Sequence, residues 1–386
     1  MSKLGVAIIG TGGVAPAHIN AFLDLPDCEV RALCYNSNIE RAQKYVSDMN
    51  LKADLYSNYK EILAREDIDV VSICLPPKLH CESTVAALEA GKHVLLEKPM
   101  ASSLEECDKI LAAQKASGKL LSIVSNYRYR TPMVKVKQML SEKAGGKLLF
   151  TKVNSLWWRG ANYHDIWWRG KWDSEGGGCT TSHAVHHLDL MQWMIGMPDK
   201  VTAVVGNVGH YNSECEDFAI AIFHYPDMVA QMTNALVWHG EQQEIIFQSE
   251  KGRLSVPWEP HAYSPMPNGF PEENKETLET LNNRYNELPD LEKENHNGQI
   301  SNFVNAILGH EELLITGSDG RNNIELIMAI YKSSVTGQTV ELPITKDDPF
   351  YRLEDWTASM PRFFQKTKSV DKIDNAPPIS FGLGKK

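Results

Sequence analysis

The chain contains a run of polar residues whose spacing suits proton transfer. The segment Gly176–Trp193 reads GGGCTTSHAVHHLDLMQW and includes Ser182, His186 and Asp189. If this segment is helical, these three side chains share one stripe, because positions i, i+4 and i+7 lie on one face of a helix. Histidine titrates near neutral pH, so His186 is a candidate to accept a hydroxyl proton, whereas Asp189 is expected to be a structural acceptor.

A lysine at the end of a predicted strand supplies a second chemical group. The apolar run His93–Leu96 is followed directly by Glu97, Lys98 and Pro99. In an open α/β sheet, ligands bind beyond the carboxyl ends of the strands, which is where this lysine would lie. Its ammonium can polarise a substrate oxygen and stabilise negative charge on it. Lys98 and His186 together therefore predict a site that polarises a substrate oxygen and moves its proton.

A glycine-rich turn near the start of the chain predicts the cofactor site. The turn Gly10–Ala15 follows a predicted strand and opens a predicted helix, so its backbone amides and the helix N-terminus would face a pyrophosphate. The G-x-G-x-x-A pattern is weak alone and becomes informative in this position between strand and helix. The residues expected to bind the cofactor are Gly10, Gly12, Gly13 and Val14, with Asn36 near the ribose and Glu97 and Lys98 near the nicotinamide.

The end of the second predicted strand bears on the choice between NAD and NADP. An acidic residue there would bind the ribose hydroxyls, but the sequence after Cys34 is Tyr-Asn-Ser-Asn, without an acid. Asn36 can still bind a ribose hydroxyl, and Arg41, a candidate partner for a 2′-phosphate, is a helical turn away. The sequence therefore favours NAD over NADP.

The first third of the chain alternates short apolar strands with helical patterns. Such alternation is typical of βαβ units and a parallel sheet. The predicted strands are Leu4–Ile9, Cys28–Cys34, Val70–Cys74, His93–Leu96 and Leu120–Val124, and the predicted helices are Ala15–Leu23, Ile39–Asp48, Leu79–Ala90 and Leu104–Ala116.

After residue 126 the pattern changes to longer strands in which apolar and polar residues alternate. This pattern predicts an α+β domain, with a mainly antiparallel sheet covered by helices on one face. Strands are expected at Lys147–Trp158, Val201–Gly206, Asp217–His224, Val229–Val237 and Glu244–Ser249, and helices at Pro132–Leu140, Gln299–Leu308 and Gly320–Ser334. The predicted organisation is an α/β dinucleotide-binding domain at 1–126, a substrate-binding domain at 127–345 and a C-terminal extension at 346–386.

Composition argues against nucleic acid or a membrane as a partner. The 386 residues carry a net charge of −10 without a block of Lys and Arg, so nothing attracts a phosphate backbone or an anionic membrane. No apolar run approaches the roughly 18 residues of a membrane span, and the first residues do not resemble a secretory signal. The seven scattered cysteines lack C-x-x-C spacing, which predicts reduced thiols in a cytoplasmic protein and no metal site.

Five tryptophans fall between residues 157 and 172, with arginine, asparagine and histidine among them. Sugars bind through their C–H faces on aromatic rings and their hydroxyls on polar side chains, whereas any single ring can instead fill a core or a subunit interface. His183 and His187 can contact substrate, pack in the core or, at i and i+4, bind a metal. The residues expected to contact the substrate are Lys98, Tyr127, Arg128, Trp158, Arg159, Tyr163, Trp168, Ser182, His183, His186 and His187.

Five segments in this order resemble one known family. They are GTGGVA at Gly10–Ala15, EKP at Glu97–Pro99, GGG-x₇-H-x-x-D at Gly176–Asp189, HNGQISNFVNAILG at His296–Gly309 and the run Asp319–Pro343. Together they resemble the glucose-fructose oxidoreductase, inositol dehydrogenase and rhizopine catabolism family (Gfo/Idh/MocA). The resemblance covers residues 1 to about 343.

The resemblance implies an N-terminal Rossmann domain and a C-terminal open sheet that often forms the interface of a homo-oligomer, a dimer or tetramer. It also implies a sugar or cyclitol bound at the nicotinamide, with Lys98 as the usual catalytic lysine and His186 as the usual histidine. In inositol dehydrogenase-like members the position four residues before this histidine is often Asp, and here it is Ser182. The Asp–His proton relay is therefore altered in this chain.

The function expected from the sequence is NAD-dependent hydride transfer at a ring hydroxyl or ketone of a sugar, glycoside or inositol, with 3-keto glycoside formation as a specific form. Two alternatives stay open. One is an NAD-assisted glycoside-cleaving enzyme that retains its cofactor. The other is an inactive regulator that binds sugar and nucleotide.

Overall fold

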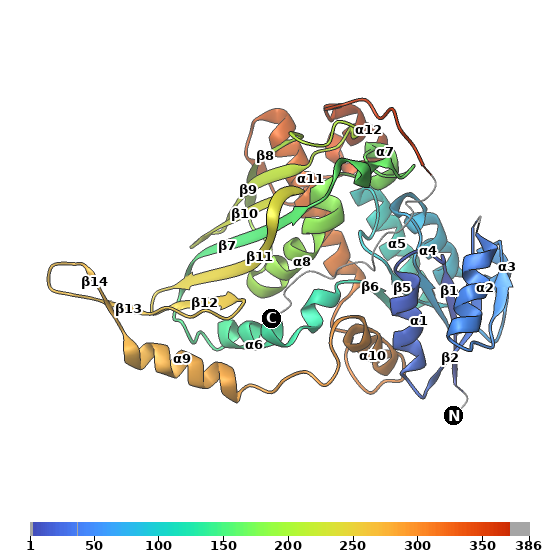
Figure 1. Cartoon of the computed structure of the whole chain (residues 1–386), viewed down its shortest axis with the longest axis horizontal. Coiled ribbons are helices and arrows are strands. Elements are labelled where there is room, and N and C mark those ends of the chain that lie inside the picture. Colours follow the sequence, from blue (N-terminus) through green and yellow to red (C-terminus); the bar gives the residue numbers. More distant parts are fainter. Residues whose placement is uncertain (1–2, 37, 371–386) are drawn as a thin grey trace.

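The computed structural model of the protein describes residues 3–36 and 38–370, which form two sheets and their helices (Figure 1). The sheet at the right of Figure 1 is parallel, and the sheet at its upper left is mainly antiparallel. The predicted fold class, an α/β dinucleotide-binding domain joined to an antiparallel α+β domain, is confirmed.

The first sheet follows the strand order β3-β2-β1-β4-β5-β6, and all its strands run parallel. Its central strands are short runs of Val, Ile and Leu, because helices cover both faces of the sheet. The strands are β1 (Leu4–Ile9), β2 (Cys28–Cys34), β3 (Asp54–Tyr56), β4 (Val70–Ile73), β5 (His93–Leu96) and β6 (Leu121–Ile123). β3 was not predicted, since three residues are too few to show a period.

The helices of this half are α1 (Ala15–Leu23), α2 (Ile39–Asp48), α3 (Tyr59–Leu63), α4 (His80–Glu89) and α5 (Leu104–Ser117), with the short 3₁₀ turns η1 (Pro77–Leu79) and η2 (Asn126–Tyr129). The ends of α5 illustrate how local sequence sets these boundaries. The side chain of Ser103 accepts a hydrogen bond from the amide of Glu106 at the N-terminus, and Gly118 ends the helix at φ +66°.

The second sheet follows the order β12-β11-β7-β10-β9-β8-β15. Its pairs are antiparallel except β7 with β10, which run parallel. The strands are β7 (Leu148–Trp158), β8 (Lys200–Gly206), β9 (Phe218–His224), β10 (Val229–Ala235), β11 (Val237–Ser249), β12 (Arg253–Val256) and β15 (Val340–Glu341). Between β7 and β8 lie η3 (Ala161–Asp165), α7 (Trp172–Glu175), the π-helical turn η4 (Thr180–Ala184) and α8 (Val185–Ile195).

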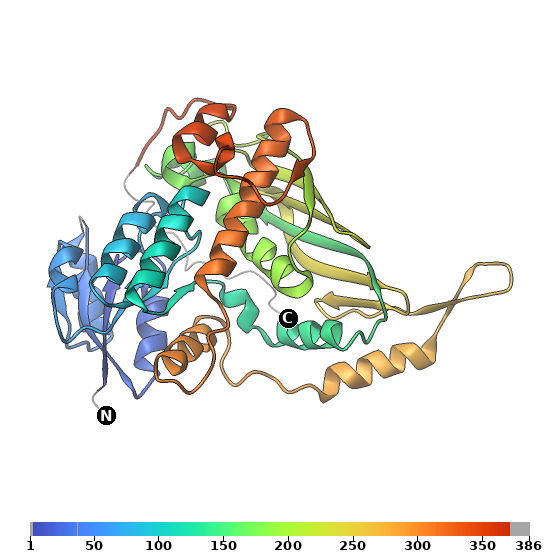
Figure 2. The same cartoon turned by 180° about the vertical axis from the view of Figure 1, so that it is seen from behind.

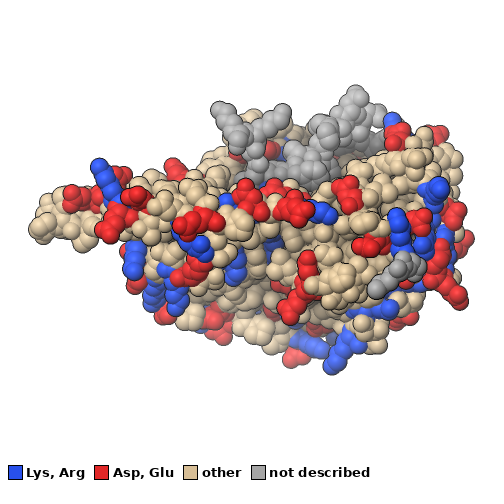
Figure 3. Space-filling model, turned by 90° about the horizontal axis from the view of Figure 1, so that it is seen from below, with Lys and Arg blue, Asp and Glu red and all other residues tan. Residues whose placement is uncertain are grey.

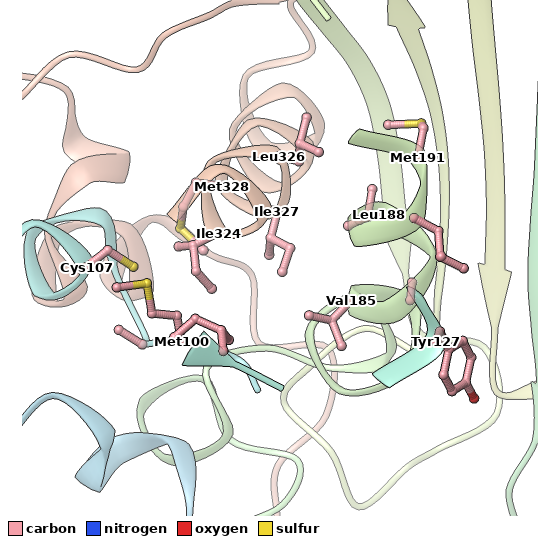
Figure 4. Packing of buried hydrophobic residues seen from close by; sticks show 14 of the residues in the cluster. Met100, Cys107, Tyr127, Val185, Leu188, Met191, Ile324, Leu326, Ile327 and Met328 are labelled. Atoms are coloured by element: carbon pink, nitrogen blue, oxygen red, sulfur yellow. The ribbon is translucent and has the colours of Figure 1, made fainter. Parts of the chain in front are cut away.

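Helices α8 and α11 (Gly317–Thr336) cover one face of this sheet and pack against each other. Figure 4 shows Val185 and Leu188 of α8 facing Ile324 and Ile327 of α11, in the core that continues to Met100 at the end of the first sheet. This shared core holds α8, which carries the predicted catalytic histidine, against the edge of the dinucleotide-binding half.

Two further helices belong to the second half. α6 (Thr131–Ser141) follows η2, and α9 (Lys275–Glu287) follows a hairpin of β13 (Tyr263–Pro265) and β14 (Pro271–Glu273). The hairpin projects far from the body in both Figure 1 and Figure 2. It lies within residues 257–295, which connect β12 to the helix that begins at Asn295.

Helix α10 (Asn295–Ile307) returns to the first half and packs on α1. Its Phe303 and Val304 join the apolar cluster under β1, and the amide of Gln299 donates to the carbonyl of Ile123 at 2.8 Å. The predicted boundaries at 126 and 345 stay a prediction, because the chain crosses between the halves more than once (Figure 2).

The predicted C-terminal extension contains η5 (Pro349–Tyr351) and α12 (Leu353–Ser359). Trp356 of α12 is fully buried, and its indole N–H donates to the carbonyl of Ser102 at 3.0 Å. Tyr351 donates its hydroxyl to Asp108 on α5 at 2.7 Å. The described part of the extension therefore ties the second half to the first.

On the face shown in Figure 3, basic and acidic side chains are interspersed and do not gather into one basic area. Among the residues that the structure describes, no helix is long and apolar enough to cross a membrane. The expectation of neither a nucleic-acid nor a membrane partner stays a prediction.

Candidate active site

The glycine turn after β1 has the shape that a dinucleotide requires. Gly10 adopts φ +102°, and a Cβ there would lie 2.5 Å from the carbonyl oxygen of Cys74, the residue after β4, so only glycine fits. A Cβ at Gly12 would meet nothing within 4 Å, which leaves open space beside the backbone. α1 begins directly afterwards, and no side chain caps its N-terminus at Val14. These features fit the binding of a pyrophosphate at Gly10, Gly12, Gly13 and Val14.

The ribose end of the cofactor site lies at the carboxyl end of β2. Asn36 is exposed there and is free of the helix cap, because the neighbouring Asn38 is the residue that caps α2, accepting a hydrogen bond from the amide of Arg41 at 2.8 Å. From α2, Tyr45 donates its hydroxyl to the carbonyl of Gly12 at 3.3 Å. Asn36 is therefore placed where the sequence predicted a ribose contact.

Two glycine variants separate cofactor binding from folding. We expect Gly12→Val to leave the melting temperature of the cofactor-free protein within about 2 °C, since the new side chain enters open space, and to weaken NADH binding at least about tenfold by filling that space. Gly10→Ala is the contrasting control, because its Cβ would collide with the Cys74 carbonyl and lower the melting temperature. Fluorescence titration with NADH and thermal unfolding measure both. Unchanged NADH affinity in Gly12→Val would contradict the assigned turn.

Lys98 lies at the carboxyl end of β5, and its ammonium reaches across to the second half. Its Nζ donates to the backbone carbonyl of Ser182 at 3.0 Å. Burial is the main cause that lowers the pKa of Lys98 from its ordinary value. The predicted lysine and the predicted histidine segment are thus brought together by the fold.

Glu97 lies behind Lys98 and holds the end of β5 in place. One carboxylate oxygen is 2.9 Å from Nε2 of His18 on α1, and the other accepts the backbone amide of Lys98 at 3.1 Å. His18 Nδ1 is in turn 2.8 Å from the hydroxyl of Ser72 on β4. Glu97 is buried in this network, where it holds the backbone of Lys98, and its contact with the cofactor stays a prediction.

His18, Glu97 and His296 offer ligand atoms within 4.8 Å of one another, and zinc binds these residue types. His18 is already satisfied by Ser72 and Glu97 through hydrogen bonds. The group therefore reads as a buried hydrogen-bonded network, and the sequence expectation of no metal stays a prediction.

The predicted stripe of Ser182, His186 and Asp189 on one helix is wrong at its first residue. Ser182 lies in the π-helical turn η4, and α8 begins only at Val185. The Ser182 hydroxyl is 2.8 Å from Nδ1 of His183 and donates to the carbonyl of Gly178 at 2.7 Å. A π-turn adds a residue to the helical repeat, so the α-helical spacing does not apply across it.

His186 stacks on Tyr127, with ring centroids 4.4 Å apart and the ring planes 12° from parallel. The guanidinium of Arg130 covers the Tyr127 ring at 3.5 Å. Burial, and then Lys98, holds the pKa of His186 well below its usual range, so this imidazole is neutral at pH 7 and able to accept a proton.

His183 lies against the aromatic wall that the sequence predicted. Its ring is edge-on to Trp157 at 5.5 Å and to Tyr163 at 5.6 Å. Burial is the largest cause that lowers its pKa well below the usual value, followed by Arg159 and Arg169. The predicted substrate residues Lys98, Tyr127, Arg159, Tyr163, Ser182, His183 and His186 therefore share one region.

Three other predicted contacts, Arg128, His187 and Trp158, have different surroundings. Arg128 is buried and bidentate to Asp189, with both N–H···O distances 2.8 Å, so its expected substrate role is replaced by a structural one. His187 is buried, its pKa is lowered to about 3 by burial, and it lies edge-on behind Tyr127. Trp158 is exposed and stacks on His239, away from His183.

Two wall residues were not among the predicted contacts. Trp157 faces His183 because side chains alternate along β7, and that alternation could have identified it from the sequence. Arg169 stacks on Tyr163 at 4.2 Å and on the predicted contact Trp168 at 4.3 Å. It also pairs with the buried Glu175, six residues later in the chain, at 2.8 Å, a spacing that follows neither a helical nor a strand period.

The fold and the site define a two-domain oxidoreductase that uses a dinucleotide. Residues 4–125 match the model of the oxidoreductase family with an NAD-binding Rossmann fold, and residues 133–255 match the GFO/IDH/MocA C-terminal domain. The chain belongs to the GFO/IDH/MocA family of oxidoreductases. The predicted family and the predicted NAD-binding fold are confirmed.

Similar proteins include several sugar dehydrogenases. D-glucoside 3-dehydrogenase from Escherichia coli is 26% identical over 88% of this chain and 98% of its own length. Levoglucosan dehydrogenase from Pseudarthrobacter phenanthrenivorans is 31% identical over 53% of this chain and 54% of its own length. Among solved structures, the WlbA dehydrogenase from Bordetella pertussis, in complex with NADH and UDP-GlcNAcA, is 25% identical with a TM-score of 0.76, covering 89% of this chain and 99% of that one.

Proposed function

We propose that the protein is an NAD-dependent dehydrogenase that oxidises a ring hydroxyl of a sugar, glycoside or inositol, with 3-keto glycoside formation as its specific reaction. The observation that carries the proposal is the approach of Lys98 to the π-helical turn, where its Nζ lies 3.0 Å from the carbonyl of Ser182. This contact places an ammonium from the dinucleotide-binding half beside the neutral imidazoles of His183 and His186.

Each residue of the proposed site then has a separate role in the reaction. When bound, the nicotinamide supplies the hydride acceptor. Lys98 binds the reacting oxygen and stabilises its developing negative charge, and His186 accepts the hydroxyl proton. Tyr127 holds the His186 ring by stacking, and Glu97 holds Lys98 through its backbone amide.

A carbohydrate substrate is supported by the wall opposite Lys98. Trp157, Tyr163 and Trp168 pack with the guanidinium groups of Arg159 and Arg169, a combination of apolar rings and hydrogen-bond donors of the kind that binds sugars. The similarity to D-glucoside 3-dehydrogenase over most of both chains supports a glycoside and oxidation at a ring carbon. The absence of a basic residue next to Asn36 supports NAD over NADP.

A substrate panel tests the proposal. Glucose, methyl glucosides, an anhydrosugar and myo-inositol are each incubated with NAD or NADP, and reduced nicotinamide and free aglycone are both measured. We expect reduced nicotinamide to form with NAD and a glycoside, and the sugar product to carry a ketone. Release of aglycone without net reduction would instead support the cofactor-retaining, glycoside-cleaving enzyme, and binding of sugar without any turnover would support the regulator.

We further propose a homo-oligomer, a dimer or tetramer formed through the second sheet. One face of that sheet is covered by α8 and α11, and on the other face alternate residues are exposed and apolar. These residues are Val204, Ile220, Ile222 and Val229. Light scattering checks the mass in solution.

The seven free cysteines support a cytoplasmic location, which cell fractionation checks.

A further inference from the structure

The hydroxyl of Ser182 fixes the tautomer of His183. A serine hydroxyl has one proton, and here the Oγ–H donates to the carbonyl of Gly178 at 2.7 Å. The 2.8 Å contact between the same oxygen and Nδ1 of His183 must therefore be donated by the histidine. The neutral ring then carries its proton on Nδ1 and presents Nε2 as a lone pair, which is the form of a base.

Nε2 of His183 makes no hydrogen bond to any residue in the ranges 3–36 and 38–370, and it is not among the fully enclosed polar atoms of that part of the chain. The ring is edge-on to Trp157 and Tyr163, so it belongs to the wall proposed to contact the sugar. The backbone carbonyl of Ser182, next to it in the chain, accepts the ammonium of Lys98. The acceptor atom and the proposed catalytic lysine therefore lie in the same part of the site.

We infer that His183, in place of His186, is the acid–base residue that accepts the proton of the reacting hydroxyl, at its Nε2, with Ser182 as its positioning residue. This inference rests on the proposed function. As the O–H bond breaks, its electron pair forms the C=O bond, the C–H electron pair leaves with the hydride for the nicotinamide, and the proton moves to Nε2. In the direction of reduction, the imidazolium returns that proton to the oxygen.

The charges around His183 suit this role. The groups that act on it are Arg159, Arg169, Lys98 and His186, all of which oppose its protonation together with burial. The two guanidinium groups are themselves paired, Arg159 with Glu241 at 2.7 Å and Arg169 with Glu175 at 2.8 Å. The imidazole therefore stays neutral at pH 7. It still accepts the proton during turnover, because an oxygen that is becoming a carbonyl is strongly acidic.

The π-helical turn supports the same assignment. Such turns are rare and occur frequently at functional sites. Here the turn Thr180–Ala184 places the Ser182 hydroxyl against His183, and not against His186. A serine cannot carry a proton as a carboxylate would, so the neighbouring imidazole supplies the titrating group that position 182 lacks.

The test compares His183→Asn with His186→Asn, and with His310→Asn on the exposed loop after α10 as the matched control. For His183→Asn we expect kcat to fall about 10²- to 10⁴-fold, with NADH affinity unchanged within about twofold. Oxidation needs the neutral imidazole, so the wild-type rate falls as pH drops, on a limb below pH 6.5 because the pKa of His183 is lowered. This acidic limb should be lost in His183→Asn and kept in His310→Asn.

Two further variants distinguish a chemical role from a structural one. Ser182→Ala should lower kcat and shift the acidic limb of the pH profile, because the tautomer of His183 is no longer fixed. Ser182→Thr keeps a hydroxyl, so its kcat and acidic limb should resemble those of the wild type. Added imidazole should raise the turnover of His183→Gly, an effect that a packing role would not produce. If His183→Asn keeps the acidic limb and kcat within about threefold, while His186→Asn loses the limb, the inference is overturned and the proposed function stands. Full turnover in Lys98→Ala would instead overturn the proposed function.

Discussion

Lys98→Ala is expected to lower kcat by about a thousandfold or more, because the reacting oxygen loses its cationic partner inside a buried site. NADH binding should stay within about threefold, since the pyrophosphate contacts lie at the glycine turn and not at the lysine. Single-turnover absorbance of the nicotinamide measures the chemical step, and fluorescence titration measures NADH binding.

The pH profile gives the same variant a second readout. An ammonium must stay protonated to act, and burial lowers the pKa of Lys98 from its ordinary value. Wild-type activity should therefore fall as pH rises through that lowered pKa, and the residual activity of Lys98→Ala should lack this alkaline limb. Lys109→Ala, at an exposed ion pair on α5, is the matched control and should keep the wild-type turnover and its alkaline limb. Turnover of Lys98→Ala at the wild-type rate would show that the lysine has no role in the reaction.

Much of the first half of the fold could be predicted because its signals are local. The strands β1 and β5 are buried apolar runs bounded by glycine or by a helix pattern, and the observed bounds of both match the predicted ones. The helix α10 shows what local signals cannot supply. Its periodicity predicts a helix, but its packing on α1 depends on Phe303 meeting side chains almost three hundred residues earlier in the chain.

The candidate site likewise contains residues that could be placed from local sequence and residues that could not. Gly10 and Lys98 could be placed because a strand end fixes the position of the residue that follows it. The π-helical turn could not be predicted, because an added residue in a helix leaves no periodic signal. As a result, the Ser182 hydroxyl contacts His183, whereas the sequence predicted that it shares a helix face with His186. Arg128 was taken for a cleft residue by its place after β6. Its partners Asp189 and Asp319 are 61 and 191 residues away in sequence, which no spacing reveals.

The buried ion pair between Arg128 and Asp189 is expected to make a large contribution to the free energy of unfolding. The Arg128 guanidinium is 1% exposed, donates twice to Asp189 at 2.8 Å and once to Asp319 at 3.0 Å. Asp189→Asn keeps the shape of the side chain and removes its charge, leaving a buried cation short of its main partner. We expect the free energy of unfolding to fall by about 3–5 kcal/mol, measured by urea denaturation.

Matched variants separate this effect from a general loss of packing. Glu105→Gln, which breaks the exposed pair with Lys109, should cost less than about 1 kcal/mol. Arg128→Met combined with Asp189→Leu removes both charges and should recover much of the loss, because no charge is then left buried without a partner.

Arg128 follows Tyr127, and Asp189 lies one turn after His186, so the ion pair also holds these two stacked rings in register. Asp189→Asn should therefore lower kcat even at temperatures where the protein stays folded, and an unfolding free energy unchanged within about 1 kcal/mol would contradict the assigned role.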